Sequence, residues 1–154
     1  MTLHKEQFNL NDVIVNTIND IKINRYFNNK KGLKILYESK HIFVKADKER
    51  ISQVIFNLLS NAIKFTNGEG EKISIISEKK ESQTVVSVKD TGTGIDPEIS
   101  SRLFSKFTSR SFSGTGLGLF ISKSIIEAHG EKISAENNSD GKGATFSFIL
   151  PANS

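Results

Sequence analysis

The chain has 154 residues, a formal net charge of +4, 36% hydrophobic and 25% charged residues, and no cysteine. This length suits one globular domain with a substantial core, and the missing cysteines exclude disulfides and thiolate metal sites. The mild positive charge is spread along the chain and gives no reason to expect a nucleic-acid partner. No apolar run approaches membrane-spanning length. We therefore expect no membrane contact in this segment and a cytoplasmic location, with or without a membrane anchor elsewhere in a parent protein.

The N-terminal part of the chain predicts a linker, a helix and two strands. Residues 1–8 are polar, and we expect them to be the remnant of a linker before a domain that spans 9–151. Apolar residues recur at helical spacing over 9–29, which predicts an amphipathic helix. Short apolar runs at 33–37 and 41–44 predict two strands separated by a polar turn.

The helix expected over 47–66 has two distinct faces at 100° per residue. A broad arc is apolar, and the opposite band carries Asn57, Asn61 and Lys64. Asparagine is a poor helix former because its amide competes for nearby backbone groups. Two asparagines one turn apart, followed by a lysine, indicate either amides held ready for a ligand or a poorly optimised surface. Asp47 is placed to cap this helix.

Two strands with period-two alternation follow. One face of the second strand is mainly apolar and ends in an acid: Thr84, Val86, Val88 and Asp90. Gly92 and Gly94 then let the backbone turn sharply and approach a ligand. A carboxylate at this position can accept a hydrogen bond from an exocyclic amine such as that of adenine. A tight turn begun by an aspartate explains the same residues without a ligand.

A short helix is expected over 96–107, because proline suits the first helical turn. Phe104 and Phe107 are expected to be core residues that anchor a polar loop. The glycine-rich run 114–119 then leads into a helix expected over 116–129, where free N–H groups and the helix dipole favour phosphate. A flexible hinge is the alternative interpretation of this run.

Two last strands are expected at 132–136 and 144–150, joined by a turn that contains 141–145. Half-buried strands paired with one-sided helices predict an α+β fold of two layers, a mixed sheet with helices on one face. The runs of adjacent strands argue against a doubly wound sheet.

In this order and spacing, the motifs resemble those of the Bergerat-fold ATP-binding superfamily, and within it the catalytic and ATP-binding domain of sensor histidine kinases. The resemblance implies a mostly antiparallel sheet of about five strands covered on one face by three helices. It extends from about Phe8 to Pro151. The matching segments are the N box at 57–66, the first glycine box at 90–94, the F box at 103–107, the second glycine box at 114–119 and the last at 141–145.

The resemblance implies a phosphate and metal site on the polar helix face. Asn61 would coordinate Mg²⁺, whose preference for oxygen ligands it meets. Asn57 would contact phosphate or metal-bound water, and Lys64 would neutralise phosphate charge, so these two residues are the candidate catalytic pair. The backbone of the second glycine box would surround the phosphates through Thr115, Gly116, Leu117 and Gly118.

The resemblance implies an adenine site at the end of the second alternating strand. Asp90 would bind the adenine amine, beside the turn made by Gly92 and Gly94, and Thr145 would assist through water. The segment 108–113 would be the lid over ATP, and it is short by the standard of the family.

The same resemblance implies cofactors and partners. ATP and Mg²⁺ would be bound, and the γ-phosphate would pass to a histidine on a dimerisation domain that this chain lacks. A response regulator would act downstream, and the isolated domain would be a monomer that does not autophosphorylate. His4 lacks the flanking acid and helix of a phosphoacceptor. His129, at a helix C-terminus where the dipole favours a protonated ring, is expected to be structural.

Other functions on the same fold stay open. An anti-sigma-type serine protein kinase would match the size, although the Lys64-Phe65-Thr66 ending and the Gly-Thr-Gly-Leu-Gly-Leu box favour a histidine kinase. A clamp ATPase, such as gyrase or the heat-shock chaperones, places a glutamate where Asn57 stands, so its absence argues against ATP hydrolysis. A binding module without enzyme activity is the remaining alternative, although each box keeps its ligand-bearing residue.

Overall fold

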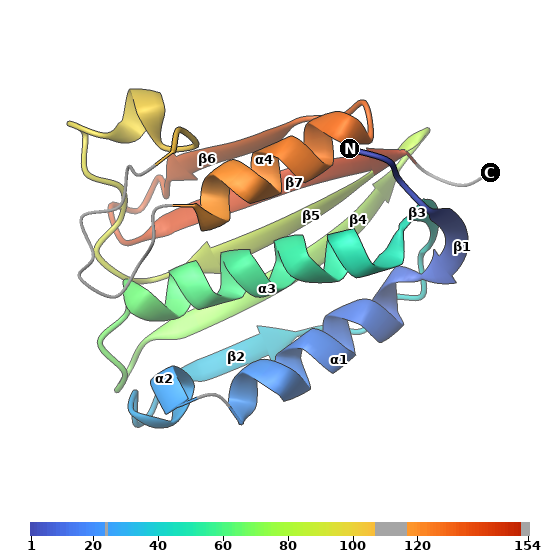
Figure 1. The fold of residues 1–154 in the computed structure, drawn as a ribbon. Coiled ribbons are helices and arrows are strands. Elements are labelled where there is room, and N and C mark those ends of the chain that lie inside the picture. Colours follow the sequence, from blue (N-terminus) through green and yellow to red (C-terminus); the bar gives the residue numbers. More distant parts are fainter. Residues whose placement is uncertain (24, 107–116, 152–154) are drawn as a thin grey trace.

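The computed structural model describes residues 1–23, 25–106 and 117–151, which form two layers (Figure 1). One layer is a five-stranded sheet with the order β2-β4-β5-β7-β6. Its strands are β2 (Lys34–Tyr37), β4 (Lys72–Lys80), β5 (Gln83–Asp90), β6 (Ile133–Asn137) and β7 (Ala144–Pro151). Strands β2 and β4 pair in parallel and the other neighbours pair antiparallel. The mixed, mostly antiparallel sheet expected from the sequence is confirmed.

The second layer consists of helices on one face of this sheet (Figure 1). The three main helices are α1 (Leu10–Lys22), α3 (Lys48–Lys64) and α4 (Gly118–Ala128), and a four-residue helix, α2 (Arg25–Asn28), follows α1. The expectation of one helix over 9–29 was therefore wrong in its length. Ile21 is the last buried residue of α1, and Ile23 just beyond it is 80% exposed, so packing does not support continuation of this helix.

The central helix α3 matches its prediction closely. Asp47 is its N-cap, and Oδ1 of this residue accepts a hydrogen bond from the backbone N–H of Arg50 at 3.3 Å. The predicted apolar arc is buried through Ile51, Val54, Ile55, Leu58, Leu59, Ala62 and Ile63. Each large aliphatic side chain removed from water in this way contributes about 1.5–3 kcal/mol to the hydrophobic driving force. The arc therefore fixes which face of α3 remains free for a ligand.

The inner face of the sheet is also as predicted. On β5, Thr84, Val86, Val88 and Asp90 are all buried, and on β7 the buried residues are Ala144, Phe146, Phe148 and Leu150. Because side chains alternate along a strand, the same register that buries these apolar residues also buries the carboxylate of Asp90. An acid is thereby brought to the edge of the core.

Two expectations about local structure were wrong. Strand β1 (Lys5–Asn9) begins within the segment expected to be a linker, and it pairs antiparallel with β3 (Phe43–Asp47) in a separate two-stranded sheet. In β1 only Phe8 is buried, so the strand leaves no alternating pattern in the sequence. The helix expected over 96–107 is reduced, within the described residues, to turns and a 3₁₀ helix at Ser100–Arg102.

The turns after Asp96 have a simple cause. Backbone bonds run from Ile99 to Asp96 at 3.0 Å and from Arg102 to Ile99 at 3.0 Å, each spanning three residues rather than four. Asp96 Oδ1 also accepts the N–H of Glu98 at 2.9 Å. Within 96–106, the described part of this segment, only Leu103 and Phe104 pack against the core, which is too narrow an apolar stripe to support an α-helix.

No helix in the described part of the chain has both the length and the apolar content needed to span a membrane.

Candidate functional site

The candidate residues gather at one end of the two-layer structure (Figure 1). The C-terminal ends of α3 and β5 and the starts of α4 and β7 all lie there. The strand and helix directions therefore place the N box, the first glycine box and the last glycine box together, although they are far apart in the sequence.

The asparagine stripe on α3 faces the start of α4. Asn57 Nδ2 donates hydrogen bonds to the Gly118 carbonyl at 3.3 Å and to Ser122 Oγ at 3.4 Å. Asn61, one turn later, has a buried Nδ2 with no hydrogen-bond partner in the part of the chain that the structure describes. Lys64 is half-buried, and its ammonium makes no ion pair or hydrogen bond with the described residues.

An orphaned buried amide is unusual, because leaving such a donor unsatisfied costs about 1–3 kcal/mol. A phosphate oxygen or a metal-bound water beside Asn61 would remove this cost. The amide oxygen of the same side chain is a hard ligand of the kind that Mg²⁺ takes. The residues present therefore fit a magnesium–phosphate group.

The carboxylate of Asp90 accepts hydrogen bonds through one of its two oxygens. Its Oδ1 accepts the backbone N–H of Gly92 at 2.9 Å and that of Ala144 at 3.2 Å. Oδ2 accepts no hydrogen bond among the described residues. Burial raises the pKa of Asp90 above its ordinary value, the two N–H groups oppose that shift, and the nearby charge of Glu71 adds to it. The result is a fixed carboxylate with one oxygen available to a donor on a ligand.

The first glycine box packs directly on the end of α3. A Cβ on Gly92 would stand 2.0 Å from the Phe65 carbonyl oxygen, so only glycine fits this position. The same carbonyl accepts the N–H of Thr93 at 3.1 Å. Gly94 has φ +80°, and a Cβ there would approach Asn137 Oδ1 to 2.8 Å. These contacts fix the distance between the asparagine stripe and Asp90.

Beside the last glycine box lies a residue, Asn138, whose importance the sequence did not indicate. Gly143 has φ +76°, and a Cβ would lie 2.1 Å from the Asp90 carbonyl oxygen. Asn138, which looked like one of several turn residues, donates from Nδ2 to that same oxygen at 2.8 Å. Thr145 Oγ1 donates to Asn138 Oδ1 at 2.6 Å, so the predicted water-bridging residue is bonded to this asparagine.

The second glycine box is described only in part. Gly118 begins α4, and a Cβ there would lie 3.8 Å from Asn57 Cγ, which is an ordinary contact. Packing against the described residues therefore does not demand glycine at this position, whereas close approach of a phosphate would. Leu117, at the N-cap position, is also described, but Thr115, Gly116 and the predicted lid at 108–113 lie outside the described residues.

The F box confirms its expected structural role at Phe104. The ring of Phe104 meets that of Phe146 on β7 edge to face, with centroids 6.3 Å apart and planes at 76°. Phe146 is 4% exposed, so this contact ties the segment before the lid to the core. Phe107, the other expected anchor, lies outside the described residues.

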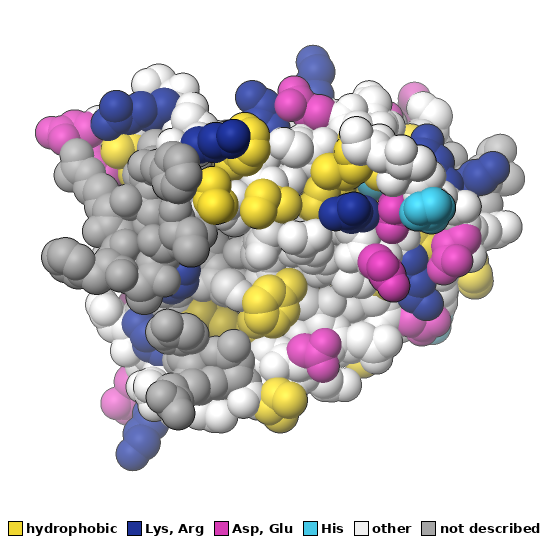
Figure 2. All heavy atoms as spheres, viewed as in Figure 1, with side chains coloured by type: hydrophobic (Ala, Val, Ile, Leu, Met, Phe, Trp, Pro, Cys, Tyr) yellow, Lys and Arg dark blue, Asp and Glu magenta, His cyan; other side chains and the backbone are white. Residues whose placement is uncertain are grey.

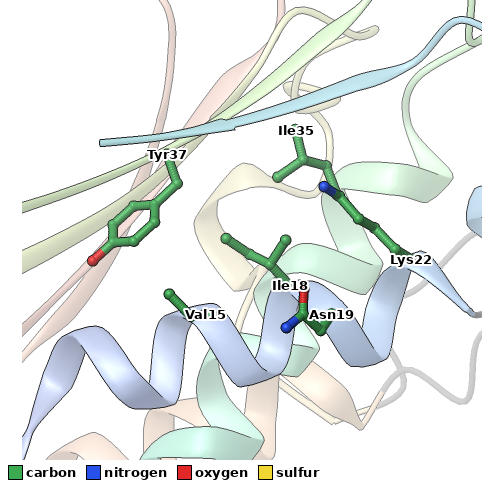
Figure 3. A pocket seen from close by; sticks show the side chains of 6 residues that line it. All are labelled: Val15, Ile18, Asn19, Lys22, Ile35 and Tyr37. Atoms are coloured by element: carbon green, nitrogen blue, oxygen red, sulfur yellow. The ribbon is translucent and has the colours of Figure 1, made fainter. Parts of the chain in front are cut away.

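Two surface features lie apart from this site. Lys and Arg side chains are scattered among acidic ones over the helix-covered face rather than gathered in one band (Figure 2). A pocket of about 200 Å³ opens between α1 and β2 (Figure 3). Its lining residues are Val15, Ile18, Asn19, Lys22, Ile35 and Tyr37, and none of them belongs to the predicted nucleotide site.

Comparison with known proteins places the chain in a family. Residues 46–154 match the family described as histidine kinase-, DNA gyrase B- and HSP90-like ATPases. Sensor protein SrrB of Staphylococcus aureus is 43% identical over 111 residues, covering 68% of this chain and 19% of SrrB. The chain thus spans about a fifth of the length of the curated relatives it matches.

Solved structures agree with this match. The nucleotide-free catalytic domain of histidine kinase ThkA has a TM-score of 0.78 and 36% identity, with 97% of this chain and 99% of that domain covered. ThkA in complex with the response regulator protein TrrA has a TM-score of 0.75 and 34% identity, with 97% of this chain and 42% of that chain covered. This chain therefore belongs to the histidine kinase-, DNA gyrase B- and HSP90-like ATPase family, as a histidine kinase catalytic domain.

Proposed function

We propose that this domain binds Mg-ATP and donates the γ-phosphate to a histidine on a separate dimerisation domain of a two-component sensor kinase. The observation that carries the proposal is the orphaned Nδ2 of Asn61 at the same end of the molecule as the half-free carboxylate of Asp90. The amide of Asn61 is suited to the phosphate end of a nucleotide, and the carboxylate of Asp90 is suited to its base. The family match supports the same assignment.

The residue roles follow from the chemistry of each group. Asp90 Oδ2 would accept the adenine amine, and Gly92 and Gly94 would form the turn beside the base. Asn61 would hold Mg²⁺ through its amide oxygen, and that ion neutralises phosphate charge when bound. The free ammonium of Lys64 would add a second positive charge. Phosphoryl transfer of this kind depends chiefly on positioning and electrostatics, which these groups supply.

The N-terminus of α4 would provide the remaining phosphate contacts. Gly118 lies within contact distance of Asn57, so the asparagine stripe and the helix start already form one surface. Backbone N–H groups from Thr115 to Gly118 would face the phosphates, because a helix N-terminus attracts anions. In this proposal Thr145 assists adenine binding through water, using the lone pairs that its bond to Asn138 leaves free.

Asn57 argues for transfer rather than hydrolysis. Its Nδ2 donates to Gly118 and Ser122, and an amide cannot take a proton from water at neutral pH. A clamp ATPase needs a base at this position. The domain would thus preserve the γ-phosphate for a protein nucleophile.

The partners in this proposal are the histidine-bearing dimerisation domain and, downstream, a response regulator. The ThkA–TrrA complex is a precedent for a response regulator partner in a related protein. We propose that the isolated domain is monomeric and works in the cytoplasm, where ATP is available and a chain without cysteine is at no disadvantage.

Phosphotransfer in trans tests the proposal. The chain is incubated with radiolabelled Mg-ATP alone, with the dimerisation domain of its parent kinase, and with that domain carrying a substituted histidine. We expect acid-labile phosphate only on the intact dimerisation domain, at a reduced rate because the tether is missing. Labelling of this chain alone, or acid-stable phosphate on a serine of the partner, would contradict the proposal.

A further inference from the structure

We infer that Asn138 is a positioning residue for adenine selection, because it fixes the main chain from which the Asp90 carboxylate projects. This inference rests on the proposed function, since it assumes that Asp90 contacts the base. Asn138 lies just after β6 and outside every segment that the sequence marked as a site.

Asn138 is fully engaged in hydrogen bonds. Its Nδ2 donates to the carbonyl oxygens of Asp90 at 2.8 Å and Lys142 at 2.7 Å, and its Oδ1 accepts from Thr145 Oγ1 at 2.6 Å. Its backbone N–H donates to the Gly143 carbonyl at 3.0 Å, and its carbonyl accepts from Gly141 at 3.0 Å. A side chain used this completely rigidifies the segments it joins.

The position of Asn138 explains why Asp90 needs such a partner. The register between β5 and β7 ends at the pair Lys89–Thr145. The Asp90 carbonyl therefore lies one residue past the last ladder pair on that side. The amide of Asn138 supplies the donor that a continuing strand would otherwise provide, so this buried main-chain group is satisfied.

Glycine at position 143 makes this arrangement possible. A Cβ on Gly143 would lie 2.1 Å from the Asp90 carbonyl oxygen and 2.7 Å from its Oδ1. Without that Cβ, the turn comes close enough for the N–H of Ala144 to bind Oδ1 at 3.2 Å. Asn138 joins this turn to Asp90, because its Nδ2 donates to the Lys142 carbonyl in the turn and to the Asp90 carbonyl on β5.

The direction of Asp90 Oδ2 consequently depends on Asn138. Losing the two Nδ2 bonds would free the Asp90 carbonyl and the turn that carries the Ala144 donor. A hydrogen bond to the base is sensitive to angle and distance, so base selection would fail first. Phosphate binding would persist, because it depends on α3 and α4 rather than on this turn.

Calorimetric titration with two nucleotides tests the inference. Mg-ADP carries the exocyclic amine, whereas Mg-IDP has a carbonyl oxygen in its place that would repel the carboxylate. The proteins compared are the wild type, Asn138→Ala, Asn138→Asp and a matched control, Asp140→Ala. Asp140 Oδ1 accepts the backbone N–H of Lys142 in the same turn at 3.0 Å, but Asp140 has no hydrogen bond to Asp90. Asn138→Asp retains an acceptor for Thr145 and replaces the two donors with a negatively charged oxygen that repels both carbonyls, which gives a second test should the alanine variant unfold.

We expect the wild type to prefer ADP over IDP by roughly tenfold or more, the worth of a hydrogen bond to a charged group. Both Asn138 variants should reduce this preference by about threefold or more, with IDP affinity unchanged, and Asp140→Ala should retain the preference. A retained preference in both Asn138 variants, an equal fall in both affinities, or a loss in Asp140→Ala would overturn the positioning role. A wild type without preference would instead contradict the adenine assignment of Asp90.

Discussion

The imidazole Nε2 of His129 lies 3.0 Å from the backbone nitrogen of Asp47 and accepts its N–H. On the other side of the ring, Nδ1 lies 2.8 Å from the Ile125 carbonyl oxygen. An amide N–H can only donate and a carbonyl can only accept, so Nε2 accepts from Asp47 and Nδ1 donates to Ile125. These two bonds support the structural role expected for His129. This ring joins the end of α4 to the start of α3.

Replacing His129 tests this joint. His129→Ala leaves the buried Asp47 N–H unsatisfied and opens a cavity, and should lower the free energy of unfolding by about 2–4 kcal/mol. Urea denaturation measures this loss. The control is His41→Ala, because His41 is exposed, and its change should stay within about 0.5 kcal/mol. Similar losses in the two variants would show that His129 does not hold the helices together.

Asp90→Asn should have opposite effects on stability and binding. Burial raises the pKa of this carboxyl, so the folded protein binds the proton more tightly than the unfolded chain does. The ionised Asp90 carboxylate destabilises the folded state at pH values above its pKa in the folded protein. This destabilisation declines as the pH falls through that pKa. An amide removes this cost, so the thermal midpoint of the nucleotide-free variant at pH 7 should exceed that of the wild type, and the difference should shrink in acid.

The affinity of the same variant for Mg-ADP should fall by roughly tenfold to a hundredfold, the range for a charged hydrogen bond. Calorimetry gives the affinity, and thermal unfolding at several pH values gives the stability. A variant that is less stable at pH 7, or one that binds Mg-ADP as tightly as the wild type, would contradict the account of Asp90.

Asn61→Ala should separate metal dependence from folding. The amide is an orphan in the nucleotide-free protein, so its removal should not lower the free energy of unfolding. Nucleotide affinity in the variant should become insensitive to Mg²⁺, because the proposed metal ligand is gone. Gln53→Ala, an exposed position on the same helix, is the control and should keep the wild-type response. An unchanged magnesium response in Asn61→Ala would remove this residue from the metal site.

Two buried threonines offer a matched comparison of stability. The hydroxyl of Thr84 is buried and has no partner within residues 1–23, 25–106 and 117–151, whereas that of Thr66 donates to the Ile63 carbonyl at 3.0 Å. Thr84→Val should raise the free energy of unfolding by about 1 kcal/mol, and Thr66→Val should lower it by about 1 kcal/mol. Chemical denaturation of both variants measures the direction of each change in the free energy of unfolding. Destabilisation by Thr84→Val would mean that its hydroxyl has a bonded partner after all.

The positions of Asp90, Asn57 and Asn61 on their elements could be predicted because they follow from periodicity. Alternation from Thr84 to Asp90 places an acid at the end of a buried face, and helical spacing places Asn57 and Asn61 opposite the apolar arc of α3. Both inferences use only the geometry of regular elements. The hydrogen bond that His129 accepts comes from a residue 82 positions away in the sequence, so no local pattern could reveal it.

Asn138 was missed for a related reason. In sequence it is one polar residue in the run Asn137–Gly141, which predicts a turn. Its bond to the Asp90 carbonyl spans 48 residues and exists because Gly143 lets two strand ends approach. Strand β1 escaped prediction because a two-stranded ladder with mostly exposed side chains does not produce alternation.

Titration calorimetry of the chain with ATP, once in Mg²⁺ and once in excess chelator, measures nucleotide binding and its dependence on the metal together. We expect one binding site per chain and a higher affinity in Mg²⁺, because in the proposed function Asp90 binds the base and Asn61 acts through the metal. The slowly hydrolysed nucleotide should be recovered intact at the end of the titration. Absence of saturable binding in Mg²⁺, or the same affinity with and without the metal, would contradict the account.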